Sequence, residues 1–522
     1  MKKLSQKRKE WIERTVENDR SYKMLIYNRF FVCAVLGSIQ IGLYLFMLFS
    51  ASKQIGQVLR AVFMLITVLT FFHLINRHQN PSTRLSWMIL ILVAPLVGGV
   101  LYLIYGEGRP MKRLNEKIQQ TKKQIYPCLF DSKNISTQAG TISAYLQTQA
   151  GYPAYADGEV VYYSEGEELF GQMLTALKNA KKFILLEYFI VSGGKLWKEI
   201  LKILLEKAEQ GVQIRMIYDD FGSILCLPPD YDKYMESLHP NIQCRAFNKV
   251  IPILSIRINH RDHRKILVVD GEIAFTGGLN LADEYIGEKI RFGHWKDTGV
   301  KITGDAVQTF TAMFFACWNT FKNTSEEITP YLSNSVKRCQ NNAIIQPYDD
   351  SPLDKISVGE TVYRDIIQRA QRYVYIFTPY LILDDFMRTA LMDAARRGVD
   401  VRIVTPGIPD KKTVYRLTRA NYPPLLEAGV SIYEYSPGFL HAKSMLCDDE
   451  RAVVGSINLD YRSLYLHFEN AVYFTDKNAL MALKKDCKNT FAVSKLCEKG
   501  YPKRTIFGKF IDNVLRLFET LI

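Results

Sequence analysis

The sequence predicts an α/β fold that is built twice, with membrane-spanning helices in front of it. Three observations predict this: long uncharged runs in the first hundred residues, a helix-glycine-strand pattern in both halves of the remainder, and a block of polar residues that recurs with identical spacing. A chain of 522 residues that is 48% hydrophobic is long enough for two soluble units and a membrane part.

The charge and the cysteines restrict the partners and the compartment. A formal net charge of +14 at pH 7 indicates an acidic partner, either nucleic acid or anionic lipid. The nine cysteines are an odd number, are widely scattered and form no CxxC pair or zinc-type spacing. We therefore expect no disulfide framework, and a reducing compartment is favoured.

Uncharged runs near the amino terminus predict transmembrane helices behind a basic flank of the cytoplasmic type at residues 1–29. The runs at 30–50 and 85–105 reach the roughly 20 residues that a helix needs to cross a bilayer. A third span is predicted at 55–75, with Arg60 extending to the interface. No small-residue cleavage site follows the first run, so we expect retained anchors and not a signal peptide.

The basic residues on either side of these runs give conflicting indications of topology. Many Lys and Arg residues precede the first run, and a second basic group follows the last run, from Arg109 to Lys123. The positive-inside rule places both flanks in the cytoplasm, whereas three crossings would separate them. Either one segment does not cross, or the catalytic part faces outward.

After a polar, basic segment at 106–150, which predicts a linker or connecting helices, two similar units are expected at 151–330 and 331–522. In the first, helices at Glu167–Ala180 and Leu196–Gln210 alternate with strands at Phe183–Val191 and Val212–Tyr218, and Gly211 ends the second helix. Strand, helix and strand in this order predict a parallel sheet.

The second unit repeats this order. Its helices are predicted at Val358–Ala370 and Met387–Arg397 and its strands at Tyr373–Phe377 and Val399–Thr405, with Gly398 as the helix stop. The segment EKAEQGVQIRMIYD in the first unit corresponds to DAARRGVDVRIVTP in the second. Duplication is the simplest account, and the alternative is coincidence between two ordinary helix-glycine-strand units.

The carboxy-terminal segment Thr505–Ile522 predicts an amphipathic helix, because its apolar and basic residues fall on different faces. A terminal helix packed on the domain and a helix in the membrane interface both fit this pattern.

Each unit ends in the same constellation of polar residues, HRKILVVDGEIAFTGGLN in the first and HAKSMLCDDERAVVGSIN in the second. Histidine and asparagine are 17 positions apart in both copies (280 minus 263 and 458 minus 441). With residue types used at about 5% each, five fixed positions recurring in register by chance would be on the order of one in a few million. The shared residues are His263, Lys265, Asp270, Gly277 and Asn280, matched by His441, Lys443, Asp448, Gly455 and Asn458.

The pattern HxKx4D followed by Gly-(Gly/Ser)-x-Asn resembles the duplicated motif of the phospholipase D superfamily. The segments NHRDHRK, GGLNLADEYIG, HWKDTGVKITGDAV and NLDYRSLYLHFEN are similar, more narrowly, to bacterial cardiolipin synthases. SWMILILVAPLVGGVLYLIYG resembles their amino-terminal membrane hairpin. The likeness runs from Ser86 to the end and departs from the family at Lys296, where arginine is usual, and at His467, where asparagine is common.

This resemblance implies a fold, an activity and a location. The implied fold is a duplicated phospholipase D-like α/β/α sandwich, with two mixed, mainly parallel sheets side by side. The implied enzyme is a cardiolipin synthase, which transfers a phosphatidyl group from one phosphatidylglycerol to another and releases glycerol. It would be a multi-pass protein of the bacterial inner or cytoplasmic membrane. The implied partners are phosphatidylglycerol and anionic membrane lipids, with no nucleic acid and no cofactor.

The residue types of the motifs fit phosphodiester chemistry. Displacing an alkoxide from phosphorus needs a nucleophile, a proton donor and cations on the non-bridging oxygens, which two histidines, two lysines and two asparagines supply without a metal. One imidazole becomes a phosphohistidine while the other protonates the leaving alcohol and deprotonates the incoming one. By analogy with relatives we expect His263 to attack and His441 to act as acid and base, with Asn280, Asn458 and Ser456 binding phosphate.

The two aspartates of the motifs, Asp270 and Asp448, join the histidines and lysines in the catalytic set. On a strand, each histidine and the lysine two positions later share a face. The aspartates lie seven positions beyond the histidines and fall on the opposite face, which favours structural ion-pair partners over acids or bases.

Other acidic residues have candidate roles. The resemblance implies that Asp297 and Glu469 each orient a catalytic imidazole, and the alternative for both is a plain surface charge. Glu187, within an apolar strand, is expected to be an interior carboxylate with a basic partner. Asp219 and Asp220 follow a strand and fit either a polyol head-group site or a helix cap.

Three other functions share these features. A phospholipase D-type hydrolase, or a different head-group transferase, would use the same covalent step and differ only in water exclusion and acceptor pockets. A nuclease would explain the basic charge but not the retained membrane spans. An inactive membrane scaffold is disfavoured because His, Lys and Asn are intact in both motifs.

Overall fold

The computed structural model describes two compact units. The described residues are 35, 37–42, 45–46, 54–76, 81–106, 109–131, 141–249, 259–322, 325–332, 340–354, 356–517 and 519. One unit, the sheet unit, consists mainly of residues 113–249 and 260–503. The other, the helical unit, consists mainly of residues 19–112 and 504–522.

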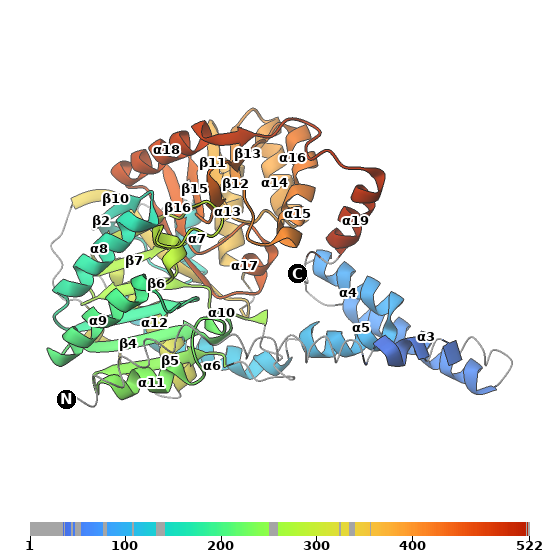
Figure 1. The fold of residues 1–522 in the computed structure, drawn as a ribbon, viewed down its shortest axis with the longest axis horizontal. Helices are drawn as coiled ribbons and strands as arrows, with labels where there is room; N and C mark the ends of the chain where they lie inside the picture. Colours follow the sequence, from blue (N-terminus) through green and yellow to red (C-terminus); the bar gives the residue numbers. More distant parts are fainter. Residues whose placement is uncertain are drawn as a thin grey trace. The chain divides into compact units, whose positions relative to one another are not determined.

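Two large β-sheets form the sheet unit (Figure 1). The first runs in the order β2 (Glu159–Tyr163), β9 (Gly299–Thr303), β7 (Ile273–Gly277), β6 (Lys265–Val269), β3 (Phe183–Tyr188), β4 (Gln213–Asp219) and β5 (Ile242–Phe247). The second runs in the order β1 (Tyr155–Asp157), β10 (Gln340–Asp350), β17 (Glu469–Phe474), β16 (Arg451–Gly455), β15 (Ser444–Cys447), β11 (Tyr373–Phe377), β12 (Asp400–Pro406), β13 (Ser431–Tyr435) and β18 (Ser494–Leu496).

The strand orders confirm the predicted duplication. Without its edge strands β1 and β18, the second sheet has the order β10-β17-β16-β15-β11-β12-β13, which matches the first sheet strand for strand. The motif strands β6 and β15 occupy the same central place in the two sheets. Two copies of one supersecondary unit therefore carry the two polar constellations.

The expectation of mainly parallel sheets is wrong. Only the pairs β3–β4 and β4–β5 in the first sheet, and β11–β12 and β12–β13 in the second, are parallel, and the other large-sheet pairs are antiparallel. The reason is the hairpin that each motif forms. Asp270 and Gly271 turn β6 directly into β7 with positive φ angles at both residues, and Asp448 and Asp449 turn β15 into β16 in the same way.

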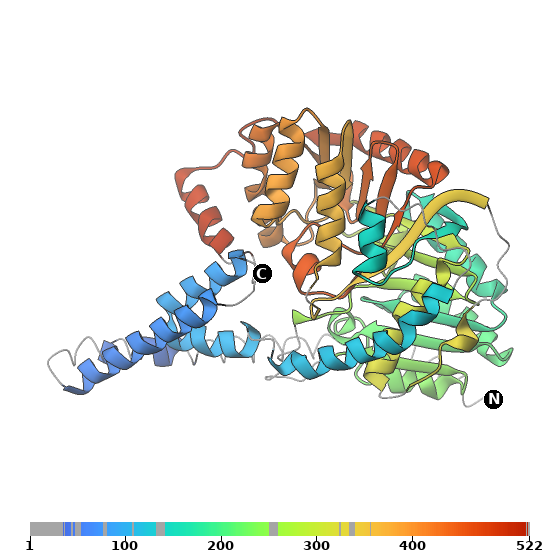
Figure 2. The ribbon, with the colours of Figure 1, turned by 180° about the vertical axis from the view of Figure 1, so that it is seen from behind.

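The predicted helices flank these strands (Figures 1 and 2). In the first repeat, α8 (Gly166–Asn179) and α9 (Lys195–Glu209) precede β3 and β4, and in the second, α13 (Val358–Arg369) and α14 (Asp385–Arg396) precede β11 and β12. Gly211 and Gly398 follow α9 and α14 with φ of 93° and 90°, a conformation that ends a helix with little strain only at glycine.

Two later helices, α12 (Val307–Lys322) and α18 (Lys477–Ala492), join the repeats. Helix α12 contacts β3 and β6 of the first sheet and β10 of the second, and α18 contacts β2 of the first sheet as well as β13 and β15 of the second. The α12 side chains Phe310, Phe314 and Trp318 are fully buried in a core shared by both sheets. The two repeats are therefore parts of one packed body and not separate domains.

The segment predicted as a linker or connecting helices, 106–150, contains α6 (Arg109–Ile125), the 3₁₀ turn η2 (Tyr126–Asp131) and α7 (Thr141–Thr148). Lys122 of α6 makes a 2.7 Å ion pair with Asp349 of β10, and Ser143 of α7 donates to Gln346 of the same strand. Strand β1, which follows α7, pairs with β10 at the edge of the second sheet.

The helical unit contains α3 (Gln54–Ile75), α4 (Pro81–Val93), α5 (Pro95–Leu101), the π-helical turn η1 (Tyr102–Gly106) and α19 (Ile506–Leu517). Among the described residues, Gly56–Ile75 is the one helix long and apolar enough to cross a membrane. It corresponds to the span predicted at 55–75. Most of the span predicted at 30–50 lies outside the described residues.

The prediction of a single helix over 85–105 is wrong, because the chain bends sharply at Ala94. Pro95 cannot donate the next helical hydrogen bond and disfavours helical angles at the preceding residue, and Ala94 has φ −137° and ψ 76°. The bend brings α5 so close to α4 that a Cβ on Gly98 would lie 2.8 Å from the Leu90 carbonyl oxygen. Helix α4 alone, with 13 residues, is about 20 Å long and too short to span a bilayer.

The predicted amphipathic helix at the carboxy terminus is α19, which contacts α4. Its side chains Ile506, Phe507 and Phe510 are exposed, while Asp512 is buried and pairs with Arg504 at 3.1 Å. The helix therefore has an apolar face that no described residue covers.

Candidate active site

The two motif histidines lie where the repeats meet, and each is held by backbone from the other repeat. Asp262, just before His263, forms a parallel bridge with Phe468, and Leu440, just before His441, pairs with Lys296. The second pairing belongs to the small sheet of β14 (Gly438–Leu440) and β8 (His294–Lys296). The His263 and His441 amides donate to the Phe468 and Lys296 carbonyls, each at 2.8 Å.

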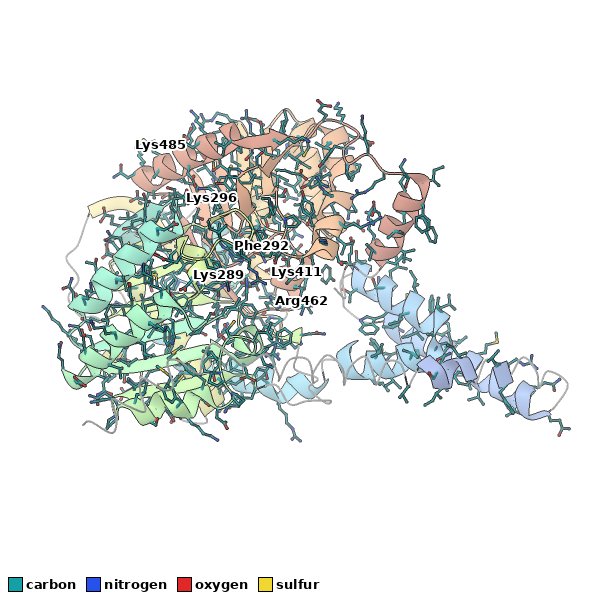
Figure 3. The ribbon with its side chains drawn as sticks, in the orientation of Figure 1. Lys289, Phe292, Lys296, Lys411, Arg462 and Lys485 are labelled. Atoms are coloured by element: carbon teal, nitrogen blue, oxygen red, sulfur yellow. The ribbon has the colours of Figure 1, made fainter. Side chains whose placement is uncertain are left out.

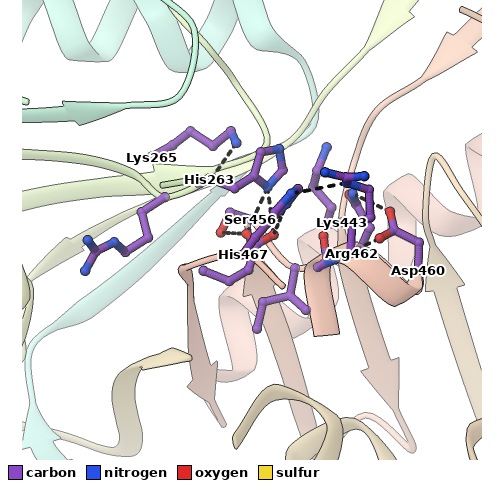
Figure 4. A network of polar contacts seen from close by, with 12 residues as sticks. His263, Lys265, Lys443, Ser456, Asp460, Arg462 and His467 are labelled. Carbon is purple, nitrogen blue, oxygen red and sulfur yellow. Dashed lines mark hydrogen bonds and ion pairs between the residues drawn. The ribbon is translucent and has the colours of Figure 1, made fainter. Parts of the chain in front are cut away.

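Each imidazole is oriented by a carboxylate of the opposite repeat. Nδ1 of His263 lies 2.8 Å from Glu469 Oε1, and Nδ1 of His441 lies 2.6 Å from Asp297 Oδ2. Both carboxylates are fully buried (Figure 4 shows the His263 side). An ionised carboxylate only accepts hydrogen bonds, so the contact with Glu469 keeps the proton of His263 on Nδ1 and leaves its Nε2 lone pair free. Nδ1 of His441 lies 2.8 Å from Lys443 Nζ as well as beside Asp297.

The two rings share one electrostatic environment. Burial, followed by the charges of Lys265, Lys443 and His441, holds the pKa of His263 well below its usual range. Burial and the same two lysines lower the pKa of His441 in the same way. Contacts agree with this: Asn280 of the first motif donates to the Tyr285 hydroxyl at 2.7 Å, and the Tyr285 ring lies 5.3 Å from that of His441. The structure therefore brings the two motifs together in a single site.

The motif lysines are buried beside the histidines. Lys265 Nζ donates to the His263 carbonyl at 2.6 Å, and Lys443 Nζ donates to the His441 carbonyl. Burial lowers the pKa of Lys265 to about 7 and that of Lys443 to about 8, although Glu469 and Asp297 oppose this. The site thus holds two lysine amino groups that gain or lose a proton near neutral pH. In their protonated form they can bind an anion.

The side chains of the motif asparagines use only part of their hydrogen-bonding capacity within the protein. Asn280 donates to the Tyr285 hydroxyl at 2.7 Å and accepts from the Ile190 amide. Asn458 donates to Asp460 at 2.9 Å, and its Oδ1 is buried without a hydrogen-bond partner among the described residues.

The prediction that Ser456 binds phosphate is replaced by a different role. Its hydroxyl donates to Glu469 Oε2 at 2.5 Å and accepts from the Asn470 amide, so its single proton fixes the orienting carboxylate. The first repeat has Gly278 at this position, where a Cβ would collide with Asp297. Beside the shorter Asp297 there is no room for a side chain at this position, whereas the longer Glu469 leaves room for the Ser456 hydroxyl.

The aspartates of the motifs do not belong to the catalytic set. Asp270 accepts from the Lys181, Lys182 and Phe183 amides at 2.7–2.9 Å, and Asp448 makes the same bonds to residues 371–373. The prediction that they fall on the opposite face of a continuing strand is wrong, because β6 and β15 end one residue earlier and both aspartates have a φ of 56° in the turns. Their principal partners are backbone amides and not cations. Burial favours a higher pKa for Asp448, yet the amide bonds keep that pKa below its usual value.

Two other acidic residues have structural partners. Glu187 is fully buried and pairs with Arg264 at 2.7 Å, as predicted for an interior carboxylate. Asp219 caps the short helix α10 (Asp220–Ser223) by accepting from the Gly222 amide at 2.8 Å, and its other oxygen accepts from the Asp262 amide. The cap interpretation is therefore confirmed for Asp219.

Aromatic side chains lie around His441. The sequence made Tyr285 and Trp295 candidates to line an acyl or glycerol channel, with core residues as the alternative, whereas Phe439 was not predicted. Tyr285, Trp295 and Phe439 have ring centroids 5.3, 5.7 and 5.8 Å from the imidazole. They come from both repeats and form an apolar wall on this side of the site. No local spacing marks them, because tertiary packing alone brings them together.

Three further polar residues lie near the site, and the sequence assigned none of them a role. Lys411, before α15 (Lys412–Ala420), contributes to the lowered pKa of both histidines (Figure 3). The His467 ring lies 5.5 Å from that of His263, and Arg462 Nε lies 3.5 Å from His467 Nε2. For His467 a signal existed, since it departs from the family pattern, whereas Lys411 and Arg462 belong to no motif.

The comparisons with known proteins agree with this geometry. The family described as "Cardiolipin synthase, PLD-like domain" matches residues 173–318 and 363–491, and "Phospholipase_D-nuclease N-terminal" matches 65–107. The chain is 33% identical to a cardiolipin synthase of Alkalihalophilus pseudofirmus over 95% of this chain and 100% of that one. It is 43% identical to an uncharacterized protein of Streptococcus mutans over 86% of this chain and 99% of that one.

A solved structure shares the fold. Phosphatidylserine synthase of Haemophilus influenzae matches with a TM-score of 0.55 and 16% identity over 73% of this chain and 98% of that one.

The first prediction concerns the lysines. Sulfate keeps its charge between pH 6 and 9, so the pH dependence of its binding reports groups of the protein. These are the two lysines and Asp297, and loss of a proton from any of them weakens the binding of an anion. Because their pKa values are about 7 and 8, affinity should be full below pH 7 and fall as the pH rises, by up to roughly tenfold per pH unit for each lysine that must be protonated. Calorimetric titration measures this, with the exposed Lys289→Ala variant as a matched control. Constant affinity up to pH 9 would contradict it.

The second prediction concerns Asp270. Replacing it by alanine leaves three backbone amides without their acceptor, so Asp270→Ala should lower the free energy of unfolding by roughly 2–4 kcal/mol. Denaturant unfolding of the purified chain measures the loss. Asp393→Ala, which removes a half-exposed partner of Arg396, should change stability by about 0.5 kcal/mol or less. Equal stability of the two variants would show that Asp270 is not structural.

Proposed function

As a member of the cardiolipin synthase family of phospholipase D-like enzymes, the chain is a phosphatidyltransferase that makes cardiolipin, and we propose that it works through a phosphohistidine on His263. The reaction joins two phosphatidylglycerol molecules and releases glycerol. The observation that carries this mechanism is the pair of exchanged contacts, His263 with Glu469 and His441 with Asp297.

In the first step, Nε2 of His263 attacks phosphorus of the donor lipid. A nitrogen–phosphorus bond forms, the bond from phosphorus to the glycerol oxygen breaks, and His441 gives that oxygen a proton. Burial raises the pKa of Asp297 to about 7, so the Asp297–His441 pair can hold an extra proton near neutral pH. The negative charge of the bound phosphodiester also favours the protonated imidazole.

In the second step, His441 takes the proton of the primary hydroxyl of the second lipid, whose oxygen attacks the phosphohistidine. The phosphorus–nitrogen bond breaks and His263 is regenerated. Lys265, Lys443 and the two motif asparagines stabilise the charge on the non-bridging oxygens in both steps. Their donor groups are fixed in position before substrate binds, so the transition state needs little reorganisation.

The aromatic wall favours transfer to a lipid over hydrolysis. Tyr285, Trp295 and Phe439 surround the imidazole that activates the acceptor. An apolar surface at this place excludes water and contacts a lipid acceptor. These contacts support a transferase over a phospholipase D-type hydrolase with the same covalent step.

The chain also has a membrane anchor, for which we propose two crossings. The first is the uncharged run 30–50 and the second is α3, which leaves the bent pair α4–α5 as a hairpin that does not cross. Two crossings place the basic flanks 1–29 and 109–123 on the same side, as the positive-inside rule requires. This arrangement removes the conflict that three straight spans create.

The third prediction separates the two histidines. His263→Ala and His441→Ala should each slow cardiolipin formation from phosphatidylglycerol by roughly a thousandfold or more, measured by mass spectrometry of the lipid products. With a nitrophenyl phosphodiester, whose leaving group needs no proton, His441→Ala should still release nitrophenol and accumulate the covalent intermediate. His263→Ala should do neither. The exposed His294→Ala is the matched control.

The outcomes distinguish the alternatives. A reversed pattern of the two variants would assign the nucleophile to His441. Phosphatidic acid without cardiolipin from the unmodified chain would contradict the transferase itself.

The fourth prediction tests the anchor. In a chain whose own cysteines are replaced, Ser52→Cys should react with a membrane-impermeant maleimide in intact cells, whereas Ser82→Cys and Lys112→Cys should react only after permeabilisation. Labelling of Lys112→Cys from outside would show that the segment 85–105 crosses after all.

A further inference from the structure

A second imidazole lies beside the His263–Glu469 pair. His467 Nδ1 is 3.7 Å from Glu469 Oε1, while His263 Nδ1 is 2.8 Å from the same oxygen. One ligand atom from each of the three residues lies within 4.8 Å of the other two. A tetrahedral zinc ion with bonds of about 2.1 Å separates its ligand atoms by roughly 3.4 Å, so small side-chain movements would suffice.

The chemistry of these groups fits a transition metal. Two imidazoles and one carboxylate are a donor set that Zn²⁺ and related divalent ions bind in proteins. Nδ1 of His467 is buried and has no hydrogen-bond partner among the described residues. The carboxylate is already fixed by the Ser456 hydroxyl, at 2.5 Å from Oε2, as the outer contacts of metal sites usually fix their ligands.

We propose that His263, His467 and Glu469 form a binding site for a divalent transition metal ion, with Zn²⁺ as the prototype, and that its occupation switches the enzyme off. The binding itself follows from geometry, whereas the inhibition rests on the proposed role of His263 as nucleophile. The ion is a regulator in this proposal and takes no part in the reaction.

A change of tautomer explains the inhibition. In the catalytic state, the Nδ1 proton of His263 faces Glu469 and Nε2 presents a lone pair to phosphorus. A metal ion on Nδ1 displaces that proton, which moves to Nε2 of the same ring, so no lone pair remains for attack. The metal also withdraws electron density from the imidazole and occupies the carboxylate that would stabilise its positive charge.

Nearby cations oppose the ion and limit its affinity. Lys265 and Lys443 are close enough to lower the pKa of His263, and Arg462 Nε, 3.5 Å from His467 Nε2, must move when that nitrogen becomes protonated.

The site exists in one repeat only. His467 lies two residues before its orienting carboxylate, and the equivalent residue before Asp297 is Trp295, which cannot bind a metal. Another group of possible ligands, Glu187, Asp262 and Cys317, already contains a cation, because Arg264 lies 2.7 Å from Glu187 and 2.8 Å from Asp262. The single imidazole of His467 therefore decides where a metal ion binds.

The fifth prediction is tested first by binding. The full-length chain in detergent is titrated with Zn²⁺ by calorimetry and with Co²⁺ by visible absorption, and we expect one equivalent with mixed nitrogen and oxygen ligands. His467→Asn should weaken binding by roughly tenfold or more, since loss of even an outer contact costs that much. His294→Asn removes a half-exposed histidine elsewhere and should bind as the unmodified chain does. Equal affinity of all three chains would overturn the proposal.

Activity provides the second measurement. Zn²⁺ should inhibit cardiolipin formation by the unmodified chain, EDTA should restore it, and His467→Asn should require at least tenfold more Zn²⁺ for the same inhibition. Equal inhibition of both chains would show that the ion acts elsewhere, on the protein or on the lipid, and would reject the site. If the chain makes no cardiolipin at all, the proposed function fails, while the calorimetric and Co²⁺ titrations still decide whether the metal site exists.

Discussion

The structure depends on an exchange of backbone and carboxylate contacts between its two repeats. The residue before each histidine pairs with the residue before the other repeat's carboxylate, Asp262 with Phe468 and Leu440 with Lys296. These short parallel contacts fix the distance from imidazole to carboxylate through main-chain hydrogen bonds, which are stiffer than contacts between side chains. The helices α12 and α18, which each contact both sheets, hold the repeats in the orientation that this exchange requires.

Burial gives the site its chemistry. Two imidazoles, two ammonium groups and two carboxylates lie together away from water, and each lowers or raises the pKa of its neighbours. The histidines stay neutral and the lysines titrate near neutral pH, so the negative charge of an arriving phosphodiester favours the protonated lysines. The same neutrality of His263 and His467 leaves their nitrogens open to a metal ion.

The sequence predicted which residues meet at the candidate site better than it predicted the strands that carry them. The repeated motif identified both histidines, their lysines and the duplication, because identical spacing survives whatever the fold. The prediction of mainly parallel sheets overlooked the Asp270–Gly271 turn. This Asp-Gly pair is a strong signal for a hairpin, but it also lies within the repeated motif. Parity assumed that the strand continues through Asp270, which instead lies in a turn and accepts from backbone amides. Ser456 could not be assigned without knowing that Glu469 comes within 2.5 Å. Pro95 argues against a single helix over 85–105, but the high hydropathy of this run favoured one.

The exchanged carboxylates have a consequence for how such a chain can change over time. Each repeat holds one half of both acid–base pairs, so neither repeat can lose function while the other compensates, and a fragment containing one repeat has an imidazole without its partner. Within each repeat, the residue beside the carboxylate is matched to the length of that carboxylate side chain, as Gly278 with the shorter Asp297 and Ser456 with the longer Glu469 illustrate. The two repeats can diverge in the size and shape of their side chains, but neither forms a complete site without the other.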